Sequence, residues 1–175
     1  ASVISSSRKV VRTDITFEQI LEAKNNLSET ALMKAVTMQH FQVADYLVEC
    51  GANINEVTLN GNTCITRTAF DGRIETAKWL LKYCKSEVNL HHRTFNGETA
   101  TLIAVKQANF ELAELFINEG GNINDRDNMG NTALHFGCMS ARMDIVEFCL
   151  EKCINCHING ENDWGMTPAM ICARN

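Results

Sequence analysis

The sequence predicts an all-α fold in which short helix–turn–helix units, joined by extended, β-hairpin-like fingers, stack into a solenoid. Two observations predict it: a pattern recurs every 33 to 36 residues, and the apolar residues within each copy are spaced as on amphipathic helices. Composition agrees, because one proline and ten glycines in 175 residues leave few helix-breaking positions. At 45% apolar and 21% charged residues, the chain can bury a core.

A threonine that follows a glycine or serine by two residues opens each unit. The five pairs are Ser28/Thr30, Gly61/Thr63, Gly97/Thr99, Gly130/Thr132 and Gly165/Thr167. A threonine hydroxyl accepts a hydrogen bond from an unpaired N–H of the first helical turn, so we expect each threonine to be an N-cap. A second apolar block follows in the first four copies and predicts a second helix. In the first copy we expect Val43, Tyr46, Leu47 and Cys50 to form its buried face.

These residues resemble the ankyrin repeat family. The segment Asp127–His135 reads DNMGNTALH and departs from the family pattern D-x-x-G-x-T-P-L-H only at Ala133. The segments Gly165–Pro168 and Gly51–Asn55 carry further family features. The resemblance covers about residues 27–175 and implies about four and a half repeats, which start near residues 27, 58, 94, 127 and 162.

The two ends of the chain are expected to differ from the repeats. Residues 14–26 predict an N-terminal capping helix, with Asp14 as its N-cap, that covers the open face of the first repeat. Residues 1–13 have no periodic pattern and predict a flexible tail. The last repeat is incomplete, which favours a fragment of a longer protein over a natural half-repeat cap.

Charge and cysteine content exclude several classes of protein. The net charge of −5 is spread along the chain, so no basic face for nucleic acid is expected. Apolar runs of about five residues are far too short to insert into a membrane. The first dozen residues lack the apolar stretch of a secretory signal, and the eight cysteines fall short of a disulfide scaffold. We therefore expect reduced thiols and an intracellular, cytoplasmic location.

One cysteine-rich string could carry metal or haem chemistry. Cys153, Cys156 and His157 match the c-type haem pattern C-x-x-C-H, and with Cys149 they could supply four zinc ligands. The repeat register instead places Cys149 in a buried helix face and the others at the helix end and in the following loop. We expect structural thiols, with no metal and no cofactor.

The histidines have structural interpretations too, and no catalytic motif is recognisable. The resemblance implies that His135 bonds to backbone between repeats. His91 and His92 are expected to form a solvated finger tip, because adjacent residues of an extended segment point apart. Phosphate-binding and nucleophile-elbow signatures are absent, so no enzyme is predicted.

The resemblance implies a non-enzymatic, monomeric module that binds a protein or peptide partner on the concave face formed by fingers and first helices. The expected partner-binding residues are Met38, Leu59, Phe70, Arg93, Phe95, Lys106, Arg126, Met129, Met139 and Trp164. Their apolar members and cations predict a partner segment with apolar anchors and some acidic character. Two alternatives remain. Phe95 and Trp164 could merely pack the fingers together, and the chain could be the targeting or regulatory arm of a larger enzyme, channel or ubiquitin-ligase adaptor.

Overall fold

The computed structural model describes residues 17–152 and 158–174. Within these residues the chain forms ten α-helices and no strand, which confirms the predicted all-α class. The first helices of the repeats are α2 (Ala31–Thr37), α4 (Cys64–Asp71), α6 (Ala100–Lys106), α8 (Ala133–Met139) and α10 (Pro168–Arg174). The second helices are α3 (Phe41–Glu49), α5 (Ile74–Tyr83), α7 (Phe110–Asn118) and α9 (Met143–Lys152).

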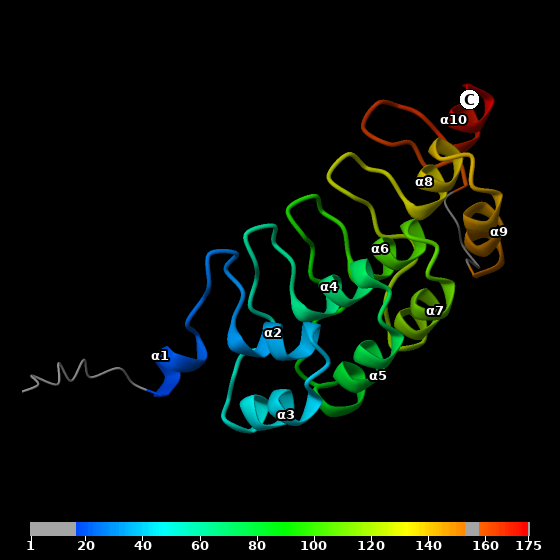
Figure 1. Ribbon diagram of the computed structural model, residues 1–175. Coiled ribbons are helices and arrows are strands. Elements are labelled where there is room, and N and C mark those ends of the chain that lie inside the picture. The colour runs from blue at the N-terminus through cyan, green and yellow to red at the C-terminus, as the bar shows by residue number, and fades with distance from the viewer. Residues whose placement is uncertain (1–16, 153–157, 175) are drawn as a thin grey trace, which may run out of the picture.

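The helices form two rows that curve together along the molecule (Figure 1). The first helices make the inner row, beside the fingers, and the second helices make the outer row. Each first helix packs against the first helix of the next repeat, and in repeats one to four also against its own second helix. The first four repeats then contribute to one continuous core, through fully buried residues such as Leu32, Leu80, Phe116 and Ile145.

The recurrent threonines are helix N-caps, as expected. The Thr30 hydroxyl accepts a hydrogen bond from the backbone N–H of Met33 at 3.2 Å, and Thr167 does the same for Met170 at 3.2 Å. Thr63 forms a capping box with the side chain of Thr66. These bonds satisfy donors that the first turn of any helix leaves unpaired, so one small residue defines where each repeat begins.

The expected buried face of the first repeat's second helix is wrong at two positions. Val43 and Tyr46 of α3 are 53% and 63% exposed, whereas Ala44 is fully buried. Leu47 packs against the core, as expected. The helix faces its neighbours through Ala44 and Leu47, because a small residue allows the two helix rows to approach closely. The outer face of α3 is consequently more apolar than the periodicity suggested.

The described part of the N-terminal segment contains helix α1 (Phe17–Leu21). Leu21 is buried and belongs to the core, while Ile20 is 56% exposed. Downstream of the helix, the Lys24 ammonium pairs with the Glu56 carboxylate at 2.7 Å. The covering role of residues 14–26 stays a prediction, and Asp14 and the tail 1–13 lie outside the described residues. No helix in the described ranges is long and apolar enough to cross a membrane.

Candidate functional site

Consecutive fingers are joined at their tips by backbone hydrogen bonds. The amide of Leu59 donates to the carbonyl of Leu27 at 3.2 Å, and the amide of Asn128 donates to Asn96 at 2.9 Å. Asp163 donates to Met129 at 3.0 Å in the same way. One such bond at each junction aligns the fingers in a row (Figure 1). The fingers are tight turns without regular strands in the described residues, so the β-hairpin-like expectation is not confirmed.

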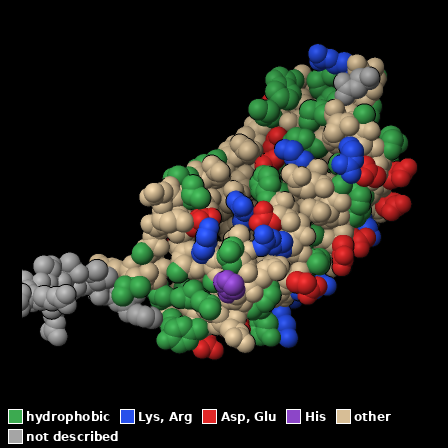
Figure 2. Space-filling view, viewed as in Figure 1, with side chains coloured by type: hydrophobic (Ala, Val, Ile, Leu, Met, Phe, Trp, Pro, Cys, Tyr) green, Lys and Arg blue, Asp and Glu red, His purple; other side chains and the backbone are tan. Residues whose placement is uncertain are grey.

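A groove runs between this row of fingers and the inner helices from repeat two to repeat five. It consists of three adjoining hollows of 200, 450 and 430 Å³. The first and second hollows share Phe95, Asn96 and Glu98, and the second and third share Met139 and Trp164. Because neighbouring hollows share walls, they form one continuous surface, which we call the groove. Hydrophobic side chains recur along this side of the molecule, with Lys and Arg side chains beside them (Figure 2).

Six of the ten expected partner-binding residues line the groove. They are Phe70, Phe95, Lys106, Met129, Met139 and Trp164. Phe95 and Trp164 are 68% and 62% exposed, so the fold leaves most of each ring uncovered. The Phe95 ring does touch the preceding finger: a Cβ atom added to Gly61 would lie 2.7 Å from its Cδ1 atom. Finger packing therefore uses one edge of this ring and leaves the rest available.

The other four expected residues lie outside the three hollows. Met38 and Leu59 are exposed near the N-terminal end of the stack. Arg93 is exposed on the third finger. Arg126 is half-buried, and its Nη1 atom donates to the backbone carbonyl of Glu161 at 2.8 Å. Arg126 therefore links two fingers, which was not anticipated from its charge.

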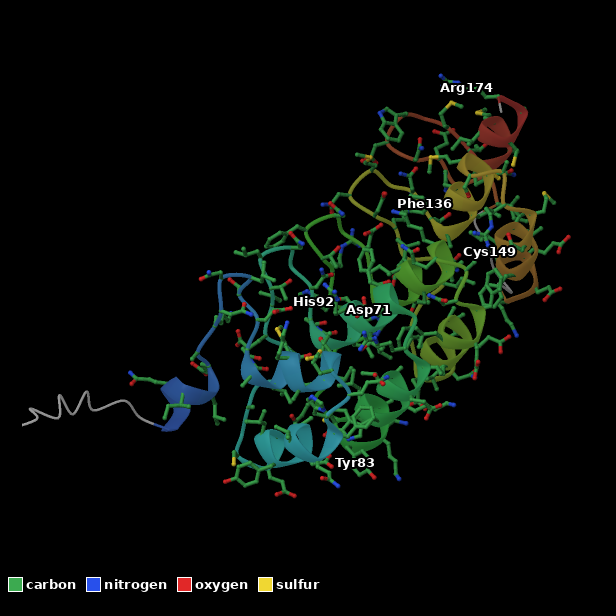
Figure 3. All side chains as sticks on the ribbon, viewed as in Figure 1. Asp71, Tyr83, His92, Phe136, Cys149 and Arg174 are labelled. Carbon is green, nitrogen blue, oxygen red and sulfur yellow. The ribbon has the colours of Figure 1, made fainter. Side chains whose placement is uncertain are left out.

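Glu98 and Phe136 are two of the groove residues that are absent from the expected partner-binding set. The Glu98 carboxylate is buried and accepts a hydrogen bond from the Lys106 ammonium at 2.7 Å. The same ammonium lies 4.3 Å from the centroid of the Phe136 ring, on helix α8 (Figure 3). The Lys106 ammonium therefore forms an ion pair with the Glu98 carboxylate and a cation–π contact with the Phe136 ring. Alignment of the repeats could have singled out Glu98, because it occupies the position that is Asn62 and Asn131 in the neighbouring repeats.

Two histidines connect neighbouring repeats. The Nδ1 atom of His135 lies 3.2 Å from the backbone nitrogen of Thr132, and Nε2 lies 3.2 Å from the carbonyl oxygen of Met166. This agrees with the structural role that the resemblance implied. Burial lowers the pKa of the His135 imidazole below its ordinary value of 6.5. The solvated-tip expectation is wrong for His92, which is half-buried with Nε2 2.8 Å from the carbonyl of Gly61.

Four of the six cysteines that the structure describes are buried, whereas Cys50 is half-buried and Cys172 is exposed. Cys64, Cys138 and Cys149 are buried, and burial raises the pKa of each thiol to about 12. A thiol with so high a pKa is a poor nucleophile at neutral pH. The ranges 17–152 and 158–174 contain no group of three or more potential ligands that could hold a metal ion. The string Cys153, Cys156 and His157 lies outside the described residues.

The repeat, its threonine caps and its fingers define an ankyrin repeat protein. A family model described as "Ankyrin repeats (3 copies)" matches residues 12–90 and 67–162, and the chain belongs to this family. Ankyrin repeat domains are generally protein-interaction modules without enzymatic activity.

Three relatives illustrate the range of proteins that share these repeats. "Nuclear factor NF-kappa-B p105 subunit" of Gallus gallus is 25% identical over 98% of this chain and 18% of its own length. "Protein fem-1 homolog A-like" of Mus musculus is 29% identical over 71% of this chain and 18% of its own length. "Putative ankyrin repeat protein FPV031" of Fowlpox virus is 28% identical over 85% of this chain and 46% of its own length. The chain spans less than half the length of each of these relatives.

Proposed function

We propose that the chain is a non-enzymatic interaction module that holds an apolar segment of a partner protein in the groove. The observation that carries this proposal is the exposure of Phe95, Trp164 and Met129 along one continuous concave surface. A fold gains nothing from leaving such side chains in water, whereas aromatic anchors dominate the energetics of protein interfaces. Methionine adapts to irregular ligand surfaces, so Met129 and Met139 suit the same role.

The charged residues around the groove indicate which charges the partner segment carries beside its apolar anchors. Arg93 is exposed beside the groove, and Arg174 lines its far end. Lys106 contributes less positive potential than its position implies, since Glu98 pairs with it. We therefore expect acidic residues in the partner near Arg93 and Arg174, on either side of an apolar centre.

A second candidate function is that of a targeting arm in a longer protein. It is favoured by the small share of the relatives, 18% in two cases, that the chain covers. The two proposals are compatible, because a targeting arm would use the same groove. Comparing partner binding by the chain alone with binding by the product of the complete open reading frame tests this candidate.

The groove can be tested with peptides selected from a phage-displayed random library. We expect Phe95→Ala and Trp164→Ala each to weaken binding of a selected peptide about 30-fold or more, which corresponds to about 2 kcal/mol, and Phe70→Ala to weaken it less. Isothermal titration calorimetry measures the affinity, and thermal melting checks the fold. Tyr46→Ala is the matched control, because Tyr46 is 63% exposed on the outer row, away from the groove.

Thr132→Ala is expected to show the opposite behaviour. Loss of this N-cap lowers the free energy of unfolding by about 1 kcal/mol and leaves the affinity of the native fraction unchanged. Aromatic variants that melt at lower temperature yet bind with wild-type affinity would show that Phe95 and Trp164 are structural, and the proposed site would fail.

A further inference from the structure

The outer helix row carries a separate hollow between the first two repeats. It has a volume of 270 Å³ and is lined by Asp45, Val48 and Glu49 of α3 and by Trp79, Tyr83 and Cys84 at the end of α5. Tyr83 lies on the outer row, away from the fingers (Figure 3). This volume suits one side chain better than a drug-sized ligand, whose pockets begin near about 300 Å³.

One wall of the hollow is formed by carboxylates that have no ion-pair partner in the described part of the chain. Asp45 accepts a hydrogen bond from the Trp79 indole N–H at 3.1 Å, which fixes one of its oxygens. Glu49 is exposed at the mouth. By contrast, Glu75 on the same row is neutralised by Lys78 at 3.0 Å. The hollow therefore keeps uncompensated negative charge.

The opposite wall is aromatic. The Trp79 and Tyr83 rings are 6.0 Å apart and tilted by 36°, and Phe41 stacks on Trp79 at 5.5 Å. Phe41 thereby holds the indole in place, while Tyr83 is 58% exposed. The Lys82 ammonium already lies 4.8 Å from the centroid of the Tyr83 ring. This ring is accordingly placed to interact with cations.

The local charges add up to a negative site. Cys84 lies at the base of the hollow, and the pKa of its thiol is raised, first by burial and then by the carboxylates of Glu87 and Asp45. Lys82 is the nearby cation that could oppose them, whereas Lys85 is paired with Glu119 at 2.6 Å. The carboxylates of Asp45, Glu49 and Glu87 therefore outnumber the one nearby ammonium group, that of Lys82, which lies over the Tyr83 ring.

We propose that this hollow binds an arginine side chain of a partner protein. A guanidinium group is planar, so it can stack on Tyr83 while its N–H groups donate to Asp45 and Glu49. An ammonium group is a compact point charge, more strongly hydrated and without a face to stack. The site lies on the outer row and goes beyond the groove proposed above, so the chain offers two partner surfaces of different chemistry.

The Trp79 indole N–H provides a direct reporter, because it is bonded to Asp45. The probe is an acetylated, amidated Gly-Arg-Gly peptide, titrated into ¹⁵N-labelled protein. The chain has two tryptophans, and Trp164→Phe assigns the two indole resonances. We expect a saturable shift of the Trp79 resonance, binding at least fivefold weaker with a lysine probe, and no shift with the neutral citrulline probe.

Charge-removing variants complete the test. Asp45→Asn keeps an acceptor for the Trp79 N–H and Glu49→Gln changes an exposed residue, so we expect the double variant to bind the arginine probe at least tenfold more weakly. If the double variant does not fold, Glu49→Gln alone is expected to weaken binding at least threefold. Glu75→Gln, a carboxylate of the same row outside the hollow, is the matched control and should leave affinity unchanged.

Two kinds of result would overturn the assignment. If the lysine or citrulline probe bound as tightly as the arginine probe, the guanidinium group would not be what the hollow recognises. If the charge-neutral variants kept full affinity, the carboxylates would play no part in binding. Phe95→Ala should bind the arginine probe like the unmodified chain. A failure of this site is therefore distinguishable from a failure of the groove.

Discussion

At the scale of single residues, His135 joins two repeats with one ring. Its Nδ1 atom meets the backbone of Thr132 at the start of its own helix, and its Nε2 atom meets the carbonyl of Met166 in the next finger. The first contact requires Nδ1 to accept a hydrogen bond and the second requires Nε2 to donate one. Only the neutral imidazole with the proton on Nε2 satisfies both.

Because the folded state favours the neutral ring, the stability of the protein should depend on pH near 6. The pKa of His135 is lowered below 6.5 in the folded state, mainly by burial, so the unfolded chain binds the proton first as the pH falls. The stabilisation is complete above 6.5 and is lost as the pH falls toward the folded-state pKa. We expect the melting temperature to fall between about pH 7.5 and pH 5.5, measured by circular dichroism.

His135→Gln is the variant that isolates this effect. Glutamine at this position can still reach back to the N-cap backbone but does not titrate. We expect a shallower pH dependence, whatever the starting stability. Hydrogen bonds from Asn25 and Lys24 hold the pKa values of Glu29 and Glu56 below 4.5, so these two carboxyl groups titrate below this pH range. An unchanged slope in the variant would show that His135 is not the group responsible.

At the scale of the structural element, the finger turn depends on how closely the next finger approaches. Gly97 has a φ of +78°, and a Cβ atom there would lie 2.2 Å from the Asn128 Oδ1 atom and 2.6 Å from the Asn128 backbone nitrogen. That nitrogen donates the bond to Asn96 that joins the third and fourth fingers. A side chain at Gly97 would therefore disturb both the turn and the junction.

Gly51 is the natural comparison, because its φ is +90° and nothing lies within 4 Å of an added Cβ. We expect Gly51→Ala to cost about 1 kcal/mol, from backbone strain alone. Gly97→Ala should cost at least about 2 kcal/mol more, because packed backbone must also move. Urea denaturation measures both. Equal losses in the two variants would mean that the contact between fingers adds nothing to stability.

Helix caps could be predicted from the sequence, whereas buried helix faces and contacts between repeats could not. Thr30 and Thr63 cap their helices through atoms of their own first turn, so a local pattern suffices to find them. Tyr46 was misassigned because the buried face depends on how closely two rows approach, and Ala44 sets that approach. Glu98 and Phe136 were missed since Lys106 joins them across two repeats. The exposure of Phe95 agrees with expectation, while its role in binding stays a prediction.

At the scale of the whole molecule, a stack in which each repeat contacts only its neighbours should be divisible. The contacts of residues 160–174 are with the fourth repeat and its finger. Helix α10 packs on α8, and the Asn162 side chain donates a hydrogen bond to the Asn131 side chain at 2.9 Å. The carbonyl of Glu161 accepts from Arg126 and that of Met166 contacts His135. The core of the first three repeats is built from other residues, Leu32, Leu80 and Phe116 among them.

We therefore expect deletion of residues 160–175 to leave the first three repeats folded. The truncated chain should lose the helical signal of α10 and part of that of α8 and α9, because α8 then has no neighbour on one side. Hydrogen exchange should show protected amides at Val36, Leu80 and Phe116, as in the intact chain, and faster exchange at Phe136, whose amide donates to Thr132 in the first turn of α8. The groove would lose Trp164, so a peptide selected against it should bind more weakly. Loss of helicity and protection throughout the truncated chain would mean that the stack folds as a single cooperative unit rather than as a sum of neighbouring repeats.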